Sequence, residues 1–133
     1  MPETDAIPAS ASIASTGLGI RYIGEHCYAY SGVLASAATP VTFLDFTTGS
    51  GYIVMDLQCF NHAINGAGNN LQYQVFLNDL MVIAQTNFDQ NNPYNRLRLI
   101  VPPFTRFTVK VDNLSGAADN ASVSVTGRVY GAE

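Results

Sequence analysis

The sequence predicts an all-β protein: a single eight-stranded antiparallel β-sandwich, jelly-roll-like, with an extended N-terminal arm. From residue 17 onward, apolar and polar residues alternate with a period of two, as they do along strands that bury one face. Clusters of Gly, Asn, Asp and Ser separate the alternating runs at regular spacing. No stretch carries the apolar stripe of an amphipathic helix. Eight short strands with polar turns favour a jelly roll among the sandwich topologies.

The alternation also predicts which residues of each strand face the core. Phe107, Val109 and Val111 alternate with polar neighbours and are expected to point inward. The run "LMVIA" (80–84) is apolar on both parities, which fits either a central strand or a strand whose outer face meets another subunit. The expected strands are residues 26–35, 40–46, 51–60, 70–77, 80–86, 95–101, 104–112 and 121–130.

Turn residues mark the ends of these strands. The "ND" pair at 78–79 lies between two apolar runs and predicts a tight hairpin, because Asn and Asp tolerate left-handed backbone. Pro102 and Pro103 interrupt what otherwise reads as one long strand. Since proline cannot donate to a β ladder, the pair predicts a stiff corner at which the chain crosses between the two sheets. Other loops are expected at 47–51, 65–70, 87–93 and 112–120.

The N-terminal segment differs from the rest of the chain. Residues 1–16 are rich in Ala, Ser and Pro without periodicity, which predicts an arm that becomes ordered on a neighbour, followed by a sandwich domain over residues 17–133. The first residues, "MPETD", are acidic and lack the basic and apolar segments of a signal peptide. Synthesis in a host cytoplasm is therefore expected, with a processed secreted protein as the open alternative.

Amino-acid composition and net charge indicate which kinds of partner the chain can bind. The chain has 133 residues, of which 47% are hydrophobic and only 12% charged, so much of its surface is uncharged. Such a surface favours an oligomer or an assembly subunit. The net charge is −4 with six Lys and Arg residues, which is not the basic surface that nucleic acid or an anionic membrane requires. No apolar run approaches transmembrane length.

Catalytic and metal-binding patterns are weak. The soft metal ligands are His26, Cys27, Cys59 and His62, but His26 and Cys27 are adjacent on an expected strand and so face opposite sides of the sheet. The two cysteines are expected to be buried and unbridged. No nucleophile elbow and no phosphate-binding loop occurs. We therefore expect neither an enzyme nor a bound cofactor or metal.

Carbohydrate binding has two candidate sites. Exposed aromatic residues beside polar loop residues suit sugar recognition. Tyr28 and Tyr30 share a parity on one expected strand. Tyr94 lies in a loop with Asp89, Asn91 and Asn92. The absence of tryptophan weighs against this function, and ordinary strand tyrosines and a polar loop are the simpler interpretation.

Five segments of strand and turn residues have a familiar texture: "LGIRYIGEHCYAYSG", "FLDFTTGSGYIV", "YQVFLND", "LIVPPFTRFTVKVDN" and "VTGRVYG". Through these segments, over residues 17–131, the chain resembles the cement or decoration proteins on the capsids of tailed phages. The resemblance implies a jelly-roll or related sandwich, often trimeric, that binds the outside of a capsid and clamps neighbouring major capsid proteins together. It implies a location on the capsid surface of the virion.

The competing function is a receptor- or carbohydrate-binding module on a tail or cell surface. The residues expected to face a partner come from the doubly apolar strand and from the polar loop after it. They are Leu80, Met81, Val82, Ile83, Tyr94, Asp89 and Asn91.

Overall fold

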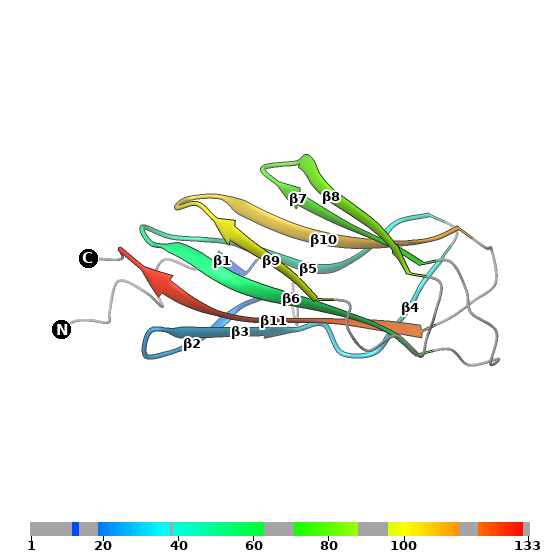
Figure 1. The fold of residues 1–133 in the computed structure, drawn as a ribbon, viewed down its shortest axis with the longest axis horizontal. Helices are drawn as coiled ribbons and strands as arrows, with labels where there is room; N and C mark the ends of the chain where they lie inside the picture. Colours follow the sequence, from blue (N-terminus) through cyan, green and yellow to red (C-terminus); the bar gives the residue numbers. More distant parts are fainter. Residues whose placement is uncertain are drawn as a thin grey trace.

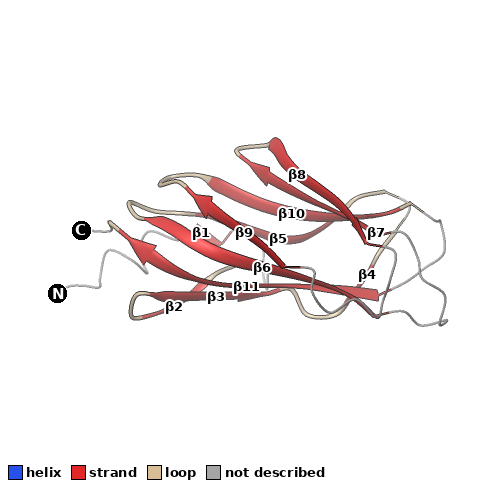
Figure 2. Cartoon of the chain, viewed as in Figure 1, coloured by secondary structure: helices blue, strands red, loops and turns tan. Residues whose placement is uncertain are grey.

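The structure is a computed structural model that describes residues 12–13, 19–37, 39–62, 71–87, 96–114 and 120–131. Within these ranges every regular element is a β-strand (Figure 2), so the predicted all-β class is confirmed. The described part of the chain contains no helix with the length and apolar character needed to cross a membrane. The eleven strands are β1 (Ser12–Ile13), β2 (Arg21–Ile23), β3 (His26–Tyr30), β4 (Leu34–Ala35), β5 (Val41–Thr47), β6 (Tyr52–His62), β7 (Leu71–Leu77), β8 (Leu80–Asn87), β9 (Arg96–Val101), β10 (Arg106–Asn113) and β11 (Asn120–Tyr130).

The strands form two antiparallel sheets that face each other as a sandwich (Figure 1). Sheet A has the order β1-β5-β10-β7-β8. Sheet B has the order β2-β3-β11-β6-β9, with β4 also pairing to β11. The predicted antiparallel β-sandwich is thus confirmed.

The predicted number of strands, eight, was wrong. Each expected strand is present with bounds close to those predicted, but the expected strand 26–35 is divided into β3 and β4. Gly32 lies between them with a φ of 76°, a left-handed conformation that ends the extended backbone. Strands β1 and β2 are additional. Their two and three residues are too few to show a period of two.

The eight longer strands pair in a nested pattern. Taken in chain order, the first pairs with the last (β3 with β11), the second with the seventh (β5 with β10), the third with the sixth (β6 with β9) and the fourth with the fifth (β7 with β8). The first four of these strands therefore pair antiparallel with the last four, in reverse order, and the resulting pairs are divided between the two sheets.

The core lies between the inner faces of the two sheets. Phe107, Val109 and Val111 are fully buried, so the predicted parity of β10 is confirmed. The Phe107 ring lies 4.9 Å from that of Phe46 on the neighbouring strand β5, measured between centroids. On β9, Leu97 and Leu99 pack against the core while Arg96 and Arg98 are exposed, again as the alternation predicts.

The proline pair has the predicted position. Strand β9 belongs to sheet B and β10 to sheet A, so the chain crosses between the sheets in the four residues 102–105. Pro102 and Pro103 begin this crossing, at positions that need no backbone N–H donor for a β ladder. The expected corner is confirmed.

The apolar strand β8 and the N-terminal arm lie at sheet edges. In the described structure β8 pairs with β7 alone, so it is an edge strand of sheet A and not the central strand that one interpretation predicted. Ser12 and Ile13 of the predicted arm form β1, opposite Thr47 and Phe46 of β5. The rest of residues 1–16 lies outside the described ranges, and the arm remains a prediction.

Candidate functional site

Four turns lie at the same end of the strands, which we call the turn end. In Figure 1 the β7–β8 turn is at the top and the other three turns are towards the left. The four turns connect β2 to β3, β5 to β6, β7 to β8 and β9 to β10. Their residues are Gly24–Glu25, 48–51, Asn78–Asp79 and 102–105. The C-terminal end of β11 lies at the same end, because Tyr130 is opposite Tyr52, the first residue of β6.

The turn end carries the most exposed large apolar side chains in the described part of the chain. These are Phe104, Ile23, Leu80 and Ile100, with exposed fractions of 72%, 69%, 68% and 58%. Each belongs to a turn or lies within two residues of one. We call these four the tip residues. Leu80 and Phe104 lie next to each other's turns, because Asn78 is hydrogen-bonded to Arg106, whereas Ile23 and Ile100 lie on the two edge strands of sheet B. Exposed apolar groups that lie close together mark an interaction site more often than scattered ones do.

The β9–β10 turn is held firmly although its backbone is unusual. Phe104 has a φ of 52°, which is rare for a bulky residue. The Phe104 N–H donates to the carbonyl of Gly49 at 2.8 Å. The buried hydroxyl of Thr48 donates to the carbonyl of Pro102 at 2.7 Å and accepts from the N–H of Thr105 at 2.9 Å. The neighbouring β5–β6 turn thus fixes the loop that presents Phe104.

The β7–β8 turn is the tight hairpin that the sequence predicts. Asn78 and Asp79 have φ values of 51° and 67°. The Oδ1 atom of Asn78 accepts from the N–H of Arg106 at 2.9 Å, and its own N–H donates to the Arg106 carbonyl at 2.8 Å. The Arg106 side chain donates twice to Asp45, at 2.9 and 2.7 Å. These hydrogen bonds and the charge of Asp45 raise the pKa of Arg106 above its ordinary value.

The predicted partner-facing residues divide into three groups. Leu80, Met81 and Val82 are exposed. A bulge between Val75 and Phe76 shifts the register opposite them, so all three are left outside the core. Ile83 is half-buried and packs against the core. Tyr94, Asp89 and Asn91 lie outside the described residues, as does Asn92. The contact of any of them with a partner remains a prediction.

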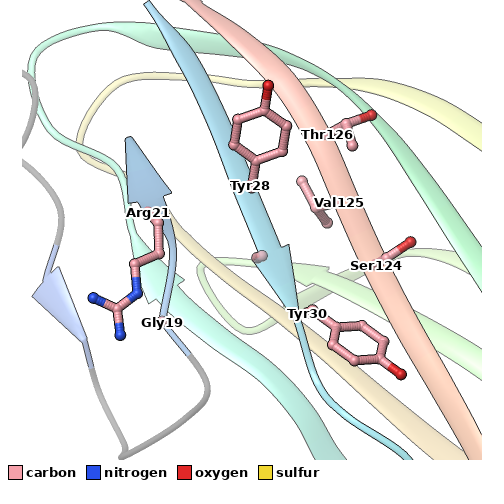
Figure 3. Close-up of a pocket in the computed structure, with 8 residues that line it drawn as sticks. Gly19, Arg21, Tyr28, Tyr30, Ser124, Val125 and Thr126 are labelled. Atoms are coloured by element: carbon pink, nitrogen blue, oxygen red, sulfur yellow. The ribbon is translucent and has the colours of Figure 1, made fainter. Parts of the chain in front are cut away.

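A second candidate site is a shallow hollow on the outer face of sheet B (Figure 3). It has a volume of about 420 Å³. Tyr28 and Tyr30 both project from the outer face of β3, as their shared parity predicts. Arg21 lies on one side of them and Ser124 and Thr126 on the other. The lining residues are Gly19, Arg21, Tyr28, Ala29, Tyr30, Ser124, Val125 and Thr126.

Positive charge is concentrated on this face of sheet B. Four of the six Lys and Arg residues lie on it, namely Arg21, Arg96, Arg98 and Arg128. Arg98 lies 3.4 Å from Asp56, and Arg128 lies 2.6 Å from Glu25. No described residue forms an ion pair with the side chain of Arg21. Among the described residues, the cation at the edge of the hollow therefore has no acidic partner.

The candidate metal ligands are separated by the sheet. His26 is exposed and Cys27 is buried, so adjacent positions on β3 do face opposite sides. Cys27 and Cys59 are free and buried, and burial raises the pKa of both thiols to about 12. The side chain of His62 is not among those described. In the described part of the chain, no three His, Cys, Asp or Glu side chains are grouped to hold a metal ion.

Sequence reasoning missed the tip residues Phe104, Ile23 and Ile100, and also Arg21. Phe104 follows two prolines directly, and an aromatic residue placed in a corner is a signal of exposure that could have been used. Arg21 could not have been paired with Tyr28 from the sequence, because that needs the register of β2 on β3.

Comparison with known proteins gives no family and only weak structural similarity. No protein-family model and no curated protein matches the chain. One similar structure is the crystal structure of the infectious bursal disease virus VP2 subviral particle, with 13% identity, a TM-score of 0.42, and coverage of 81% of this chain. The chain spans only 34% of that protein. Another is a family 35 carbohydrate binding module from an environmental isolate, with 16% identity, a TM-score of 0.36, and coverage of 90% of this chain and 79% of the other. At these TM-scores neither likeness tells what this chain does.

Proposed function

We propose that this protein is a non-enzymatic virion structural protein that binds the outside of a phage capsid and cements neighbouring major capsid proteins. The observation that carries the proposal is the exposure of the tip residues at the turn end, above all of Phe104 and Leu80. The turns beside these two residues are joined by the hydrogen bonds between Asn78 and Arg106, and we take this end as the attaching surface. The resemblance of the sequence to capsid decoration proteins supplies the partner. The virion surface is accordingly the proposed location.

The tip residues suit protein attachment because they combine apolar area with fixed geometry. Burying a side chain the size of Phe, Ile or Leu stabilises a complex by roughly 1.5–3 kcal/mol. A rigid anchor loses less conformational entropy on binding than a mobile one. Phe104 has this property, since Thr48 and Gly49 hold its turn by hydrogen bonds. A few such anchors supply most of the binding energy in many interfaces.

The sandwich is proposed to be a jelly roll. That fold has eight strands in two sheets, built from two Greek keys. The nested pairing of the eight longer strands, with β3 on β11 outside and β7 on β8 inside, supports this topology.

Cementing would work by mass action. Contacts that exist only in the assembled shell stabilise the shell over its separated subunits. Strand β1, which belongs to the predicted arm, lies beside the last residues of β5, next to the turn end. We propose a trimer as the attached form, which light scattering would detect as a mass near three times 14.3 kDa.

Cosedimentation with phage capsids that lack this protein tests the proposal. We expect saturable binding by the wild-type chain and a higher melting temperature of the shells. Phe104→Ser and Leu80→Ser should each weaken binding about tenfold or more, because each removes an apolar anchor. Leu114→Ser is the matched control, since Leu114 is also apolar and exposed but follows β10 at the opposite end of the sandwich.

Two results would contradict the proposal. The first is a wild-type chain that fails to bind any shell. The second is binding that Leu114→Ser weakens as much as Phe104→Ser does, which would mean that the turn end is not the attaching surface.

A further inference from the structure

We propose that the hollow on the outer face of sheet B binds an acidic saccharide, that is, a sugar that carries a carboxylate. The hollow shares no residue with the tip residues of the turn end. The inference therefore stands apart from capsid attachment, and either can fail without the other.

The two tyrosines provide the surface for a sugar ring. Tyr28 and Tyr30 are two residues apart on β3, so their side chains leave the sheet about 7 Å from each other on the same face. Both are exposed. A tyrosine ring offers a flat apolar face together with a polar hydroxyl. A pyranose ring has the complementary character, with C–H groups on its faces and hydroxyls around its edge.

The remaining polar groups of the hollow suit sugar hydroxyls. Ser124 lies opposite Tyr30, and Thr126 lies opposite Tyr28, so the sheet register sets two hydroxyls beside two aromatic rings (Figure 3). A Ser, Thr or Tyr hydroxyl both donates and accepts hydrogen bonds. A sugar hydroxyl does the same, so each partner can satisfy the other in either direction.

Arg21 determines the charge of the ligand. Of the described residues that line the hollow, Arg21 alone is charged, and it lies opposite Tyr28 in the register of β2 on β3. In an adjoining hollow of about 260 Å³, the lining residue Arg98 is paired with Asp56, and Arg128 with Glu25. Arg21 has no such acid among the described residues. A guanidinium group binds a carboxylate through two parallel hydrogen bonds, so a carboxylated ligand is favoured.

An acidic peptide is the other ligand with this charge, and the position of β3 disfavours it. Peptides bind sheets most readily by adding a strand to an open edge. Strand β3 lies between β2 and β11, so the sheet ladder flanks residues 26–28 on both sides and Ala29 and Tyr30 on the β11 side. A peptide laid across the hollow would leave its own amide groups without partners from the sheet. A saccharide has no backbone amides to satisfy.

NMR titration with defined sugars tests the inference. The probes are trigalacturonate and sialyllactose, each compared with a neutral counterpart, the methyl ester of the first and lactose for the second. We expect the amide signals of Tyr28, Tyr30, Ser124 and Thr126 to shift with at least one acidic sugar below about 10 mM. The two acidic probes distinguish a uronic acid from a sialic acid as the natural source.

Variants separate charge recognition from stacking. Arg21→Gln should weaken binding of the acidic sugar about tenfold and leave the neutral sugar unchanged. Tyr30→Ala should remove binding of both. Arg96→Gln is the control, since Arg96 is an exposed arginine on the same sheet but outside the lining of the hollow. Thermal melts of each variant check that the fold is retained.

The inference would be overturned by the absence of shifts with both acidic sugars. Equal binding of acidic and neutral sugars would overturn the role of Arg21. A peptide of glutamate residues that shifts the same amides more strongly than either sugar would make the ligand a protein instead.

Discussion

The β7–β8 and β9–β10 turns meet the same backbone requirement with different residues. Both contain left-handed backbone, with φ values of 51° and 67° at Asn78 and Asp79 and of 52° at Phe104. Asn and Asp adopt this conformation readily, whereas a bulky residue there is an outlier. The first turn is thus made of residues that favour its shape. The second holds an unfavourable residue in place through hydrogen bonds from the neighbouring turn.

The difference indicates that the residue at position 104 of the β9–β10 turn is not the one that folding alone favours. A glycine or asparagine at position 104 would form the same turn with less strain. The residue present instead is aromatic and is the most exposed large apolar side chain described. Strained positions of this kind cluster at binding sites. The contrast therefore agrees with Phe104 as an anchor for a partner.

The largest expected effect separates two phenylalanines that are three residues apart. Phe107→Ala should lower the free energy of unfolding by roughly 3–5 kcal/mol, because it empties a fully buried site beside Phe46. Phe104→Ala should change it by no more than about 0.5 kcal/mol, since an exposed ring contributes little to the core. Urea denaturation measures both. Equal losses would mean that Phe104 is part of the fold rather than of a binding surface.

Removing the support of the β9–β10 turn should have the next largest effect. Thr48→Val keeps the shape of the side chain but leaves the carbonyl of Pro102 and the N–H of Thr105 without their partner. Buried polar groups that lose a partner cost about 1–3 kcal/mol each. Denaturant melts should show a loss in that range, and Thr48→Ser should recover most of it. A neutral Thr48→Val would show that the turn does not depend on this hydroxyl.

The β7–β8 turn should respond to a change in backbone preference. Asn78→Ala should lower stability by about 1–2 kcal/mol, because alanine disfavours a φ of 51° and lacks the acceptor for the Arg106 N–H. Asn78→Gly keeps the backbone preference and loses only the acceptor, so its cost should be smaller. The difference between the two variants measures the backbone contribution. Identical costs would assign the whole effect to the hydrogen bond.

The sequence predicted the strands better than the ends of the molecule. Alternation identifies the inward residues of a strand because the side-chain period is fixed, and Phe107, Val109 and Val111 are buried as expected. Alternation does not fix where a strand begins. The expected strand 104–112 included Phe104, whereas β10 begins at Arg106, so the place of Phe104 in a turn was missed.

Contacts between distant segments were equally hidden from the sequence. Asp45 and Asp56 lie on either side of the 47–51 turn in the sequence. In the structure Asp45 belongs to sheet A and pairs with Arg106, whereas Asp56 belongs to sheet B and pairs with Arg98. These partners depend on the order of strands in each sheet, which no local pattern encodes.

The smallest expected effect concerns the strain at Phe104 itself. Phe104→Gly should raise the free energy of unfolding by about 0.5–1 kcal/mol relative to Phe104→Ala. Alanine and phenylalanine share a steric penalty of about 1–2 kcal/mol at a φ of 52°, which glycine does not have. Part of this gain in stability is offset because glycine has more conformational freedom in the unfolded chain. Both variants should bind capsids more weakly than the wild type, since both lack the ring. Stability and attachment would then change in opposite directions at one residue, which is the behaviour expected of a position where strain is retained for binding. A glycine variant less stable than the alanine variant would show instead that the turn does not strain residue 104. The β9–β10 turn would then not differ from the β7–β8 turn in backbone strain.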